Sequence, residues 1–277
     1  MAVCAVVCAL GACVRPAAVG SYARAAGKTA AEFPALAADM HASCLRLEGY
    51  RESRQGDGWF DRADLAPRCA EREKAVKRTV TVERVLASYF TALAGLADDK
   101  VASYDKSIGK LAGSLEDDAR LDGKQVRAVA NLAEFAASVA TDGYRRSKLT
   151  SVIASQNANV ATVIDALAEI VGTDYANILD LEEAGMNSFY RSALAEGGAG
   201  EPLAAILVRD TRDTHAAVLG EKRQALAAYV RALATMKAGH QRLYESRSDL
   251  DAKALVGELA GYATQLEEMI PALRRAF

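Results

Sequence analysis

The sequence predicts an all-α protein, an elongated antiparallel helical bundle built around a long helical hairpin. Only 5 prolines and 6% aromatic residues occur in the 277-residue chain, so helix breakers and strand formers are both scarce. No stretch alternates β-branched and aromatic side chains between turns, as strands would. Apolar side chains instead recur at steps of three and four residues. These observations favour helices throughout, in a chain long enough to bury a large core.

The hairpin is predicted from Thr150 to Arg247. On the first arm, apolar side chains fall into two seven-residue series that form a coiled-coil-like seam. The series are Ile153, Val160, Leu167, Asp174 and Leu181, and Asn157, Ile164, Val171, Ile178 and Gly185. The return arm matches them with Leu219, Leu226, Leu233 and His240, beside Tyr229, Met236 and Leu243. A glycine-rich reversal at Gly197 to Pro202 separates the arms, each about 45 residues or roughly 65 to 70 Å long.

Two helices are expected before this hairpin. The first is predicted from Thr29 to Glu52, because Thr29 and Glu32 match a capping box. A turn-rich segment from Ser53 to Asp61 follows, and Asp64 is placed to cap the second helix. That helix presents Val82, Leu86, Tyr89, Leu93 and Leu96, and its pattern resumes with Val101, Tyr104, Ile108, Leu111 and Leu115.

Two shorter helices complete the expected bundle. After a turn at Leu121 to Gly123, the first presents Val126, Val129, Leu132, Phe135 and Val139. The last begins near Ser248 and presents Leu255, Leu259, Tyr262, Leu266, Met269 and Leu273. Pro271 is expected to bend its end.

The charge balance argues against nucleic acid as a partner. The chain has 34 basic and 36 acidic residues, and both signs are interspersed along the helices. Neither a phosphate-binding stripe nor a polybasic lipid-binding surface is therefore expected.

The N-terminus indicates export. Residues 2–12 form an uncharged apolar run of the length expected for the hydrophobic segment of a secretory signal. Leu10, Gly11, Ala12 and Cys13 resemble the lipobox of bacterial lipoproteins, in which a dedicated peptidase cuts before a diacylated cysteine. The resemblance covers these residues only, and it departs from the pattern because no Lys or Arg precedes the run.

The resemblance implies an address and a domain layout. Residues 1–12 would be the signal, residues 13–28 a tether and residues 29–277 the bundle domain. The absence of Asp after Cys13 resembles the sorting signal for the outer membrane, so the expected location is periplasmic, with a lipid anchor in that membrane. Two alternatives stay open: an exported protein without lipid, and a cytoplasmic protein with an alanine-rich start.

The cysteines fit an exported chain. Cys4 and Cys8 would leave with the signal and Cys13 would carry lipid, which leaves Cys44 and Cys69 as an even pair in an oxidising compartment. They lie on either side of the predicted turn, so an antiparallel pair of helices would bring them together as a disulfide. In a cytoplasmic protein both would be ordinary core thiols.

The aromatic pair Trp59 and Phe60, and the polar residue Asn157, each allow two interpretations. Trp59 and Phe60 lie at the tip of the predicted turn, where they either pack back on the bundle or offer a contact site for a partner. Asn157 lies on the apolar seam of the hairpin. It is either buried, fixing the register at a cost in stability, or placed where the seam opens to solvent.

The sequence predicts no metal, cofactor or catalytic site. His41, His215 and His240 are far apart and lack metal-motif spacing, and His240 lies on the packed face of its helix. On a helix, His215 points about 140° away from Asp210, which with Asp213 would otherwise suggest a ligand set.

Two short motif matches are incomplete. Gly27, Lys28 and Thr29 match the end of a phosphate-binding loop, but Tyr22 stands where its first glycine belongs. Ser103 and Lys106 match Ser-x-x-Lys, but the partner motifs of that enzyme class do not occur in the chain. No enzyme is therefore predicted.

The sequence predicts a non-enzymatic envelope lipoprotein that acts as a structural or protein-binding helical module. Long hairpins expose much surface, which suits envelope protein partners, and the lipid would supply the membrane contact. One alternative is a periplasmic bundle that senses or binds a small ligand between its helices. Another is a helical membrane-active protein, which would need an apolar segment that can be released.

Overall fold

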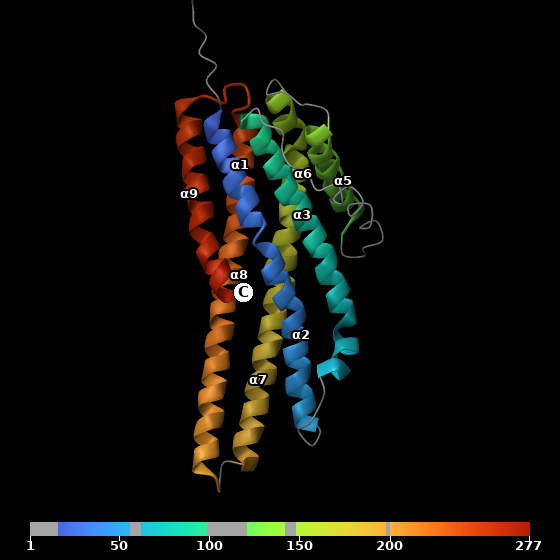
Figure 1. The fold of residues 1–277 in the computed structure, drawn as a ribbon, viewed down its shortest axis with the longest axis vertical. Helices are drawn as coiled ribbons and strands as arrows, with labels where there is room; N and C mark the ends of the chain where they lie inside the picture. Colours follow the sequence, from blue (N-terminus) through green and yellow to red (C-terminus); the bar gives the residue numbers. More distant parts are fainter. Residues whose placement is uncertain (1–15, 56–61, 99–120, 142–147, 198–199) are drawn as a thin grey trace, which may run out of the picture.

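The computed structural model describes residues 16–55, 62–98, 121–141, 148–197 and 200–277. Every element in these ranges is helical, which confirms the all-α prediction. Figure 1 shows an elongated bundle of long helices that run side by side. Several residues singled out in the sequence lie outside the described ranges: Cys13, Trp59, Phe60, Ser103, Lys106 and the predicted pattern from Val101 to Leu115.

The long hairpin is present. Its first arm comprises α6 (Leu149–Glu169), η3 (Ile170–Tyr175) and α7 (Ala176–Gly197), and α8 (Pro202–Glu245) is the return arm. The 44 residues of α8 extend about 66 Å at 1.5 Å per residue. Both α6 and α7 pack along α8 (Figure 1).

The first arm contains a π-helical turn, η3, that the heptad pattern did not predict. Up to the start of the turn, the seam buries Val160, Ile164, Leu167 and Val171, as expected, and Ile178 of the second series is buried too. From the end of the turn onward, the buried face also includes Tyr175, Leu179, Glu182, Met186 and Tyr190, while Leu181 is 53% exposed. A π turn adds one residue and so rotates the following helix by roughly 100°. The extension of the first series to Asp174 and Leu181 is therefore wrong.

The predicted tether is also wrong for residues 17–28. These residues belong to α1 (Ala17–Ala30), which packs against α3 and α9, and Val19, Tyr22 and Ala26 are fully buried. Small side chains allow this helix to approach its neighbours closely without a stripe of large apolar residues. On α8, Gly239 leaves room for the Tyr22 ring, which a Cβ at that position would overlap.

The first predicted helix is divided in two. Thr29 lies in the last turn of α1 and its Oγ1 donates to Ala25 O at 3.0 Å, so it does not cap the next helix. That helix, α2 (Phe33–Gln55), begins at Phe33 with Pro34 in its first turn, a position that proline tolerates.

The remaining helices follow the predicted faces. A 3-10 segment, η1 (Arg62–Cys69), leads into α3 (Ala70–Asp98). Asp122 Oδ1 accepts hydrogen bonds from the N–H groups of Lys124 and Gln125 at the start of α5 (Gly123–Thr141). The last helix, α9 (Lys253–Ala276), packs on α1 and α8. The predicted core residues Val82, Leu86, Tyr89, Leu93, Leu96, Val129, Leu132, Phe135, Val139, Leu255, Leu259, Leu266 and Leu273 are all buried.

Within the described ranges, the helical stretch Ala63–Asp98 is long and apolar enough to cross a membrane by length and composition. In the bundle, however, 67% of its apolar window is buried. Burial of this kind is what a core helix shows, because its apolar face is already covered by neighbouring helices.

Candidate functional site

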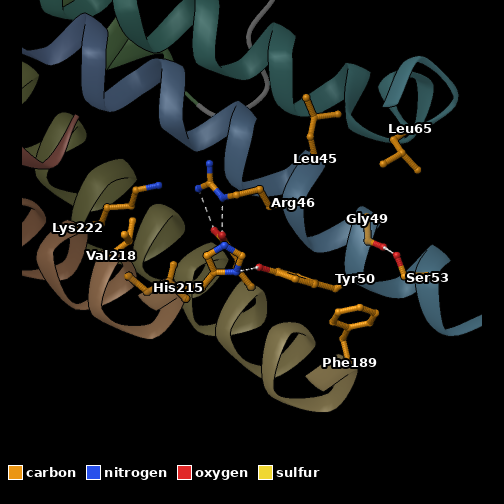
Figure 2. Close-up of a pocket in the computed structure, with 12 residues that line it drawn as sticks. Leu45, Arg46, Gly49, Tyr50, Ser53, Leu65, Phe189, His215, Val218 and Lys222 are labelled. Atoms are coloured by element: carbon orange, nitrogen blue, oxygen red, sulfur yellow. Dashed lines mark hydrogen bonds and ion pairs between the residues drawn. The ribbon is translucent and has the colours of Figure 1, made fainter. Parts of the chain in front are cut away.

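A cavity of about 280 Å³ lies between α2, α7 and α8 and is bordered by η1 (Figure 2). Most of its lining is apolar, and its polar groups come from all three long helices. The lining residues are Leu45, Arg46, Gly49, Tyr50 and Ser53 of α2, Leu65 of η1, Glu182 and Phe189 of α7, and His215, Val218, Leu219 and Lys222 of α8.

One end of the cavity is aromatic. The Tyr50 ring lies 5.8 Å from the Phe189 ring and 6.2 Å from the Tyr190 ring, measured between centroids. Phe189 and Tyr190 themselves meet edge to face at 5.0 Å. These contacts fix the ring planes, so the aromatic end is a rigid apolar wall.

His215 lies beside this wall. Its Nδ1 atom is 2.9 Å from the Tyr190 hydroxyl and 3.2 Å from the Tyr50 hydroxyl. Burial, with the neighbouring Tyr190 and Glu182, raises the pKa of Tyr50 to about 12, and burial also raises the pKa of Tyr190. Both phenols therefore keep their protons at neutral pH. We assign the single lone pair of Nδ1 as the acceptor of the shorter contact, from Tyr190, which places the ring N–H on Nε2.

The other end of the cavity is charged and centres on Arg46. Its guanidinium bridges two carboxylates. Nε and Nη2 donate to Glu182 at 2.5 and 3.1 Å, while Nη1 and Nη2 donate to Asp39 at 3.0 and 3.1 Å. The side chain of Glu182 is only 3% exposed, so this acid depends on its partners for solvation.

Three further side chains complete this charged network. Lys222 Nζ donates to Asp39 Oδ1 at 2.8 Å, and the Tyr175 hydroxyl donates to Asp39 Oδ2 at 2.5 Å. The Ser43 hydroxyl donates to Glu182. Burial alone would raise the pKa of Asp39, but the hydrogen bonds from Arg46, Lys222 and Tyr175 outweigh it and lower that pKa. Two acids thus balance two bases, and every oxygen of the two acids accepts at least one hydrogen bond, as a buried network requires.

The π turn brings two members of this network into place. Tyr175 is the last residue of η3, and Glu182 follows in α7 on the same face. With uniform α-helical geometry, Leu181 would occupy the seam and Glu182 would lie beside it. The inserted residue turns Tyr175 and Glu182 toward α2, in keeping with the frequent occurrence of π turns at functional sites.

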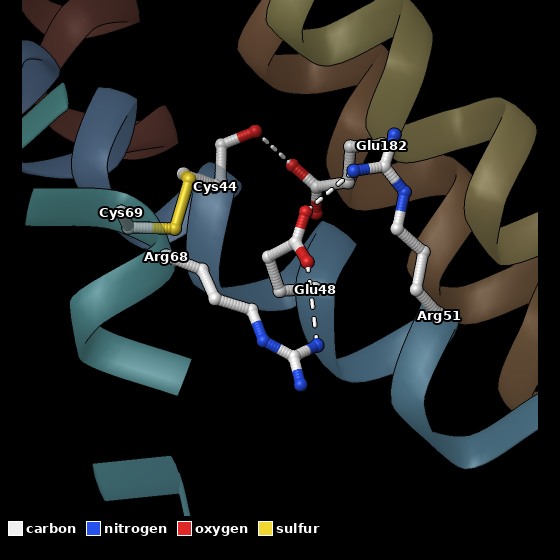
Figure 3. Close-up of a disulfide and its surroundings, with 7 residues drawn as sticks. Cys44, Glu48, Arg51, Arg68, Cys69 and Glu182 are labelled. Carbon is white, nitrogen blue, oxygen red and sulfur yellow. Dashed lines mark hydrogen bonds and ion pairs between the residues drawn. A yellow bond between two sulfur atoms is a disulfide. The ribbon is translucent and has the colours of Figure 1, made fainter. Parts of the chain in front are cut away.

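The two cysteines hold η1 against the cavity. Cys44 of α2 and Cys69 of η1 lie at disulfide-bonding distance, with their Cα atoms 6.0 Å apart (Figure 3). The prediction that they face each other across an antiparallel pair is confirmed. Next to them, Arg68 contacts Glu52 at 2.8 Å and Glu48 at 3.6 Å. Together these links position η1, which contributes Leu65 to the cavity wall.

His240 and His215 lie in different environments. His240 is 1% exposed and packs in the core between α3 and α6, as its helical face predicted. His215 shares no helical face with Asp210, and the sequence predicted no site there, but its side chain lies at the cavity. Its partners Tyr50 and Tyr190 are distant in the sequence, so no local spacing could reveal the site. In the described ranges, no group of three or more His, Cys, Asp or Glu side chains could hold a metal ion.

Comparisons with protein-family models, with curated proteins and with solved structures found no match.

Proposed function

We propose that this protein is a non-enzymatic binding module of the bacterial cell envelope that holds a small, largely apolar ligand between α2, α7 and α8. The observation that carries the proposal is the cavity, because an apolar body with a few fixed polar groups is the usual construction of a ligand site. A volume of about 280 Å³ accommodates on the order of ten non-hydrogen atoms, since one water takes up about 30 Å³.

The polar groups favour binding over catalysis. Asp39 and Glu182 both accept hydrogen bonds from Arg46, so neither acts as an available general base. The Nδ1 atom of His215 is occupied by tyrosine hydroxyls. What the cavity offers to a ligand is shape, apolar contact and hydrogen-bond donors.

A lipid anchor at Cys13 would hold the bundle at the membrane. Cys13 precedes Ala17, the first residue of α1, by four positions, a reach of at most about 14 Å. An anchored bundle would therefore lie close to the outer membrane. The paired Cys44 and Cys69 support an oxidising compartment.

The address is tested by Cys13→Ser. We expect this variant to keep its signal and to leave the detergent phase in which the wild type partitions. An unchanged mass and unchanged partitioning would reject the lipid anchor and the outer-membrane address.

Ligand binding is tested with four probes of equal chain length: octanol, octanamide, octanoate and octylamine. At least one should bind to the purified protein in isothermal titration calorimetry. Val218→Trp should abolish binding, because residue 218 lines the cavity. Val256→Trp is the control, since Val256 on α9 has a similar exposure, 40% against 42%. If none of the four probes binds, the proposed function is wrong.

A specific surface favours a second function, the binding of an envelope protein. Leu203, Ile206 and Leu207, at the start of α8, are 68, 59 and 57% exposed. Their spacing places them on one helical face at the tip of the hairpin. Ile206→Glu should then release a partner crosslinked in envelope fractions, while Val256→Glu should retain it. Equal crosslinking by both variants would rule out the tip.

A further inference from the structure

We propose that the cavity selects a singly charged amphipathic anion, a carboxylate with a short apolar body. The carboxylate would lie toward Lys222 and His215, and the apolar body toward Phe189 and Leu65. This inference rests on the proposed ligand-binding function and names the ligand's chemical class. It follows from the asymmetry in Figure 2, where the cationic side chains and the aromatic wall occupy different ends of the cavity.

The charge of the cavity lining favours an anion. Three side chains that carry full charges border the cavity: the cations Arg46 and Lys222 and the anion Glu182. Asp39, which balances the second cation, is not part of the lining. With Asp39 the network is neutral overall, but two cations and one anion line the cavity itself. A carboxylate placed beside Arg46 and Lys222 is therefore favoured over a positive headgroup at the same position.

The cavity lining also has N–H groups that are not used within the protein. The ammonium group of Lys222 has three N–H donors. Among the described residues, one of them is bound by Asp39. A guanidinium has five, and four of those on Arg46 go to Asp39 and Glu182. The Nε2–H of His215 has no acceptor in the described part of the chain. The unused hydrogen-bonding groups of these three side chains are thus donors.

The acceptors at this end are already engaged. Both oxygens of Glu182 receive hydrogen bonds, from Arg46 and Ser43. Both oxygens of Asp39 do so as well, from Arg46, Lys222 and Tyr175. A ligand ammonium would find few open acceptors there, one further lone pair on Glu182 Oε1 and the phenol oxygens of Tyr50 and Tyr190, whereas a carboxylate accepts from several donors at once.

The apolar end of the cavity limits the size of the apolar body of the ligand. Leu45, Leu65 and Phe189 line it, and the Tyr50 ring packs against Phe189 at 5.8 Å. Because the whole cavity holds on the order of ten non-hydrogen atoms, the apolar body is a short chain or a single ring. Octanoate, with a headgroup of two oxygens, fills this space and serves as the probe.

The test compares headgroups on the full bundle by titration calorimetry. Octanoate should bind at least about tenfold more tightly than octanamide, as expected for hydrogen bonds that involve a charged group. Octylamine should bind more weakly than either. His215→Phe, which leaves the charged network intact, should reduce the preference for octanoate by several-fold.

Lys222→Met should remove most of the preference, while Lys237→Met is the matched control. Lys237 is also on α8 and pairs with a carboxylate, Asp165, at 2.7 Å, but lies away from the cavity lining. The ranking on the wild type and on His215→Phe remains decisive if Lys222→Met does not fold. Equal affinity for octanoate and octanamide would overturn the anion preference while the ligand-binding function stands. Absence of binding by every probe would overturn both.

Discussion

The Tyr89 hydroxyl lies 2.6 Å from Nε2 of His240 and joins α3 to α8 in the centre of the bundle. The Asn157 side-chain oxygen lies 2.9 Å from His240 Nδ1 and can only accept, so Nδ1 carries the ring hydrogen. Nε2 is then the acceptor of the Tyr89 hydroxyl. The Asn157 amide in turn donates to Gln241 at 2.8 Å. A continuous, directional chain of hydrogen bonds thus links α3, α8 and α6.

Asn157→Leu should lower the free energy of unfolding. Asn157 is half-buried, and its amide makes hydrogen bonds at both ends, so replacement leaves the His240 N–H without an acceptor. The expected loss is about 1 to 3 kcal/mol. Asn131→Leu, at an exposed position, should change stability by no more than about 0.5 kcal/mol. A higher melting temperature for Asn157→Leu would show that the chain contributes nothing to stability.

His240 should make the protein lose stability in acid. Burial lowers its pKa to about 3, whereas in the unfolded chain a histidine takes up a proton below about pH 6.5. The unfolded state therefore binds more protons between about pH 6.5 and 3. The free energy of unfolding should fall by roughly 1.4 kcal/mol for each pH unit in that window.

His240→Gln isolates this effect, because glutamine can hydrogen-bond to Tyr89 and Asn157 without titrating. Chemical denaturation from pH 7 to pH 4 should show a steeper loss for the wild type than for the variant. Parallel pH profiles would mean that His240 does not stay neutral in the folded protein.

Gly239→Ala should destabilise the bundle by about 1 to 3 kcal/mol, because its Cβ would overlap the buried Tyr22 ring. Gly220 is in the same helix, and a Cβ there meets nothing within 4 Å. Gly220→Ala should therefore stabilise α8 by about 0.5 to 1 kcal/mol. Thermal unfolding of both variants checks the contact between α1 and α8. Similar effects of the two substitutions would contradict the packing of α1 in the core.

Loss of the Cys44–Cys69 link should cost about 3.5 kcal/mol on the chain-entropy model, given a sequence separation of 25. The double variant Cys44→Ser, Cys69→Ser should also bind octanol more weakly, because η1 supplies Leu65 to the cavity. Thiol counting on denatured, unreduced protein tests the bond itself. Two reactive thiols from this pair would reject the disulfide and weaken the case for export.

The sequence predicted those parts of the fold that depend on local periodicity. Steps of three and four identified the α3, α5, α8 and α9 faces, and the position of two cysteines about a turn predicted their pairing. It did not predict α1, because Gly20, Ala23 and Ala26 pack through close approach and leave no large apolar stripe. It also missed η3, because heptad counting assumes a constant number of residues per turn.

The candidate site depends on contacts between residues far apart in the sequence and on the π turn η3. Arg46 and Glu182 are 136 positions apart, and Lys222 and Asp39 are 183 apart, so only the packed bundle brings them together. The rotation introduced by η3 then decides that Glu182 faces α2 in place of Leu181. A polar residue that follows a π turn has no distinct signature in a seven-residue pattern, and the cavity could not be predicted for the same reason.

An isotope-filtered nuclear Overhauser experiment on the purified bundle with octanol would locate the bound ligand. This probe tests the location of the ligand independently of any headgroup charge. Contacts between octanol methylene protons and the side chains of Phe189 and Leu65 are predicted, and Val218→Trp should remove them. Contacts confined to the exposed Ile206 and Leu207 at the hairpin tip, or no contacts at all, would contradict a ligand site between α2, α7 and α8.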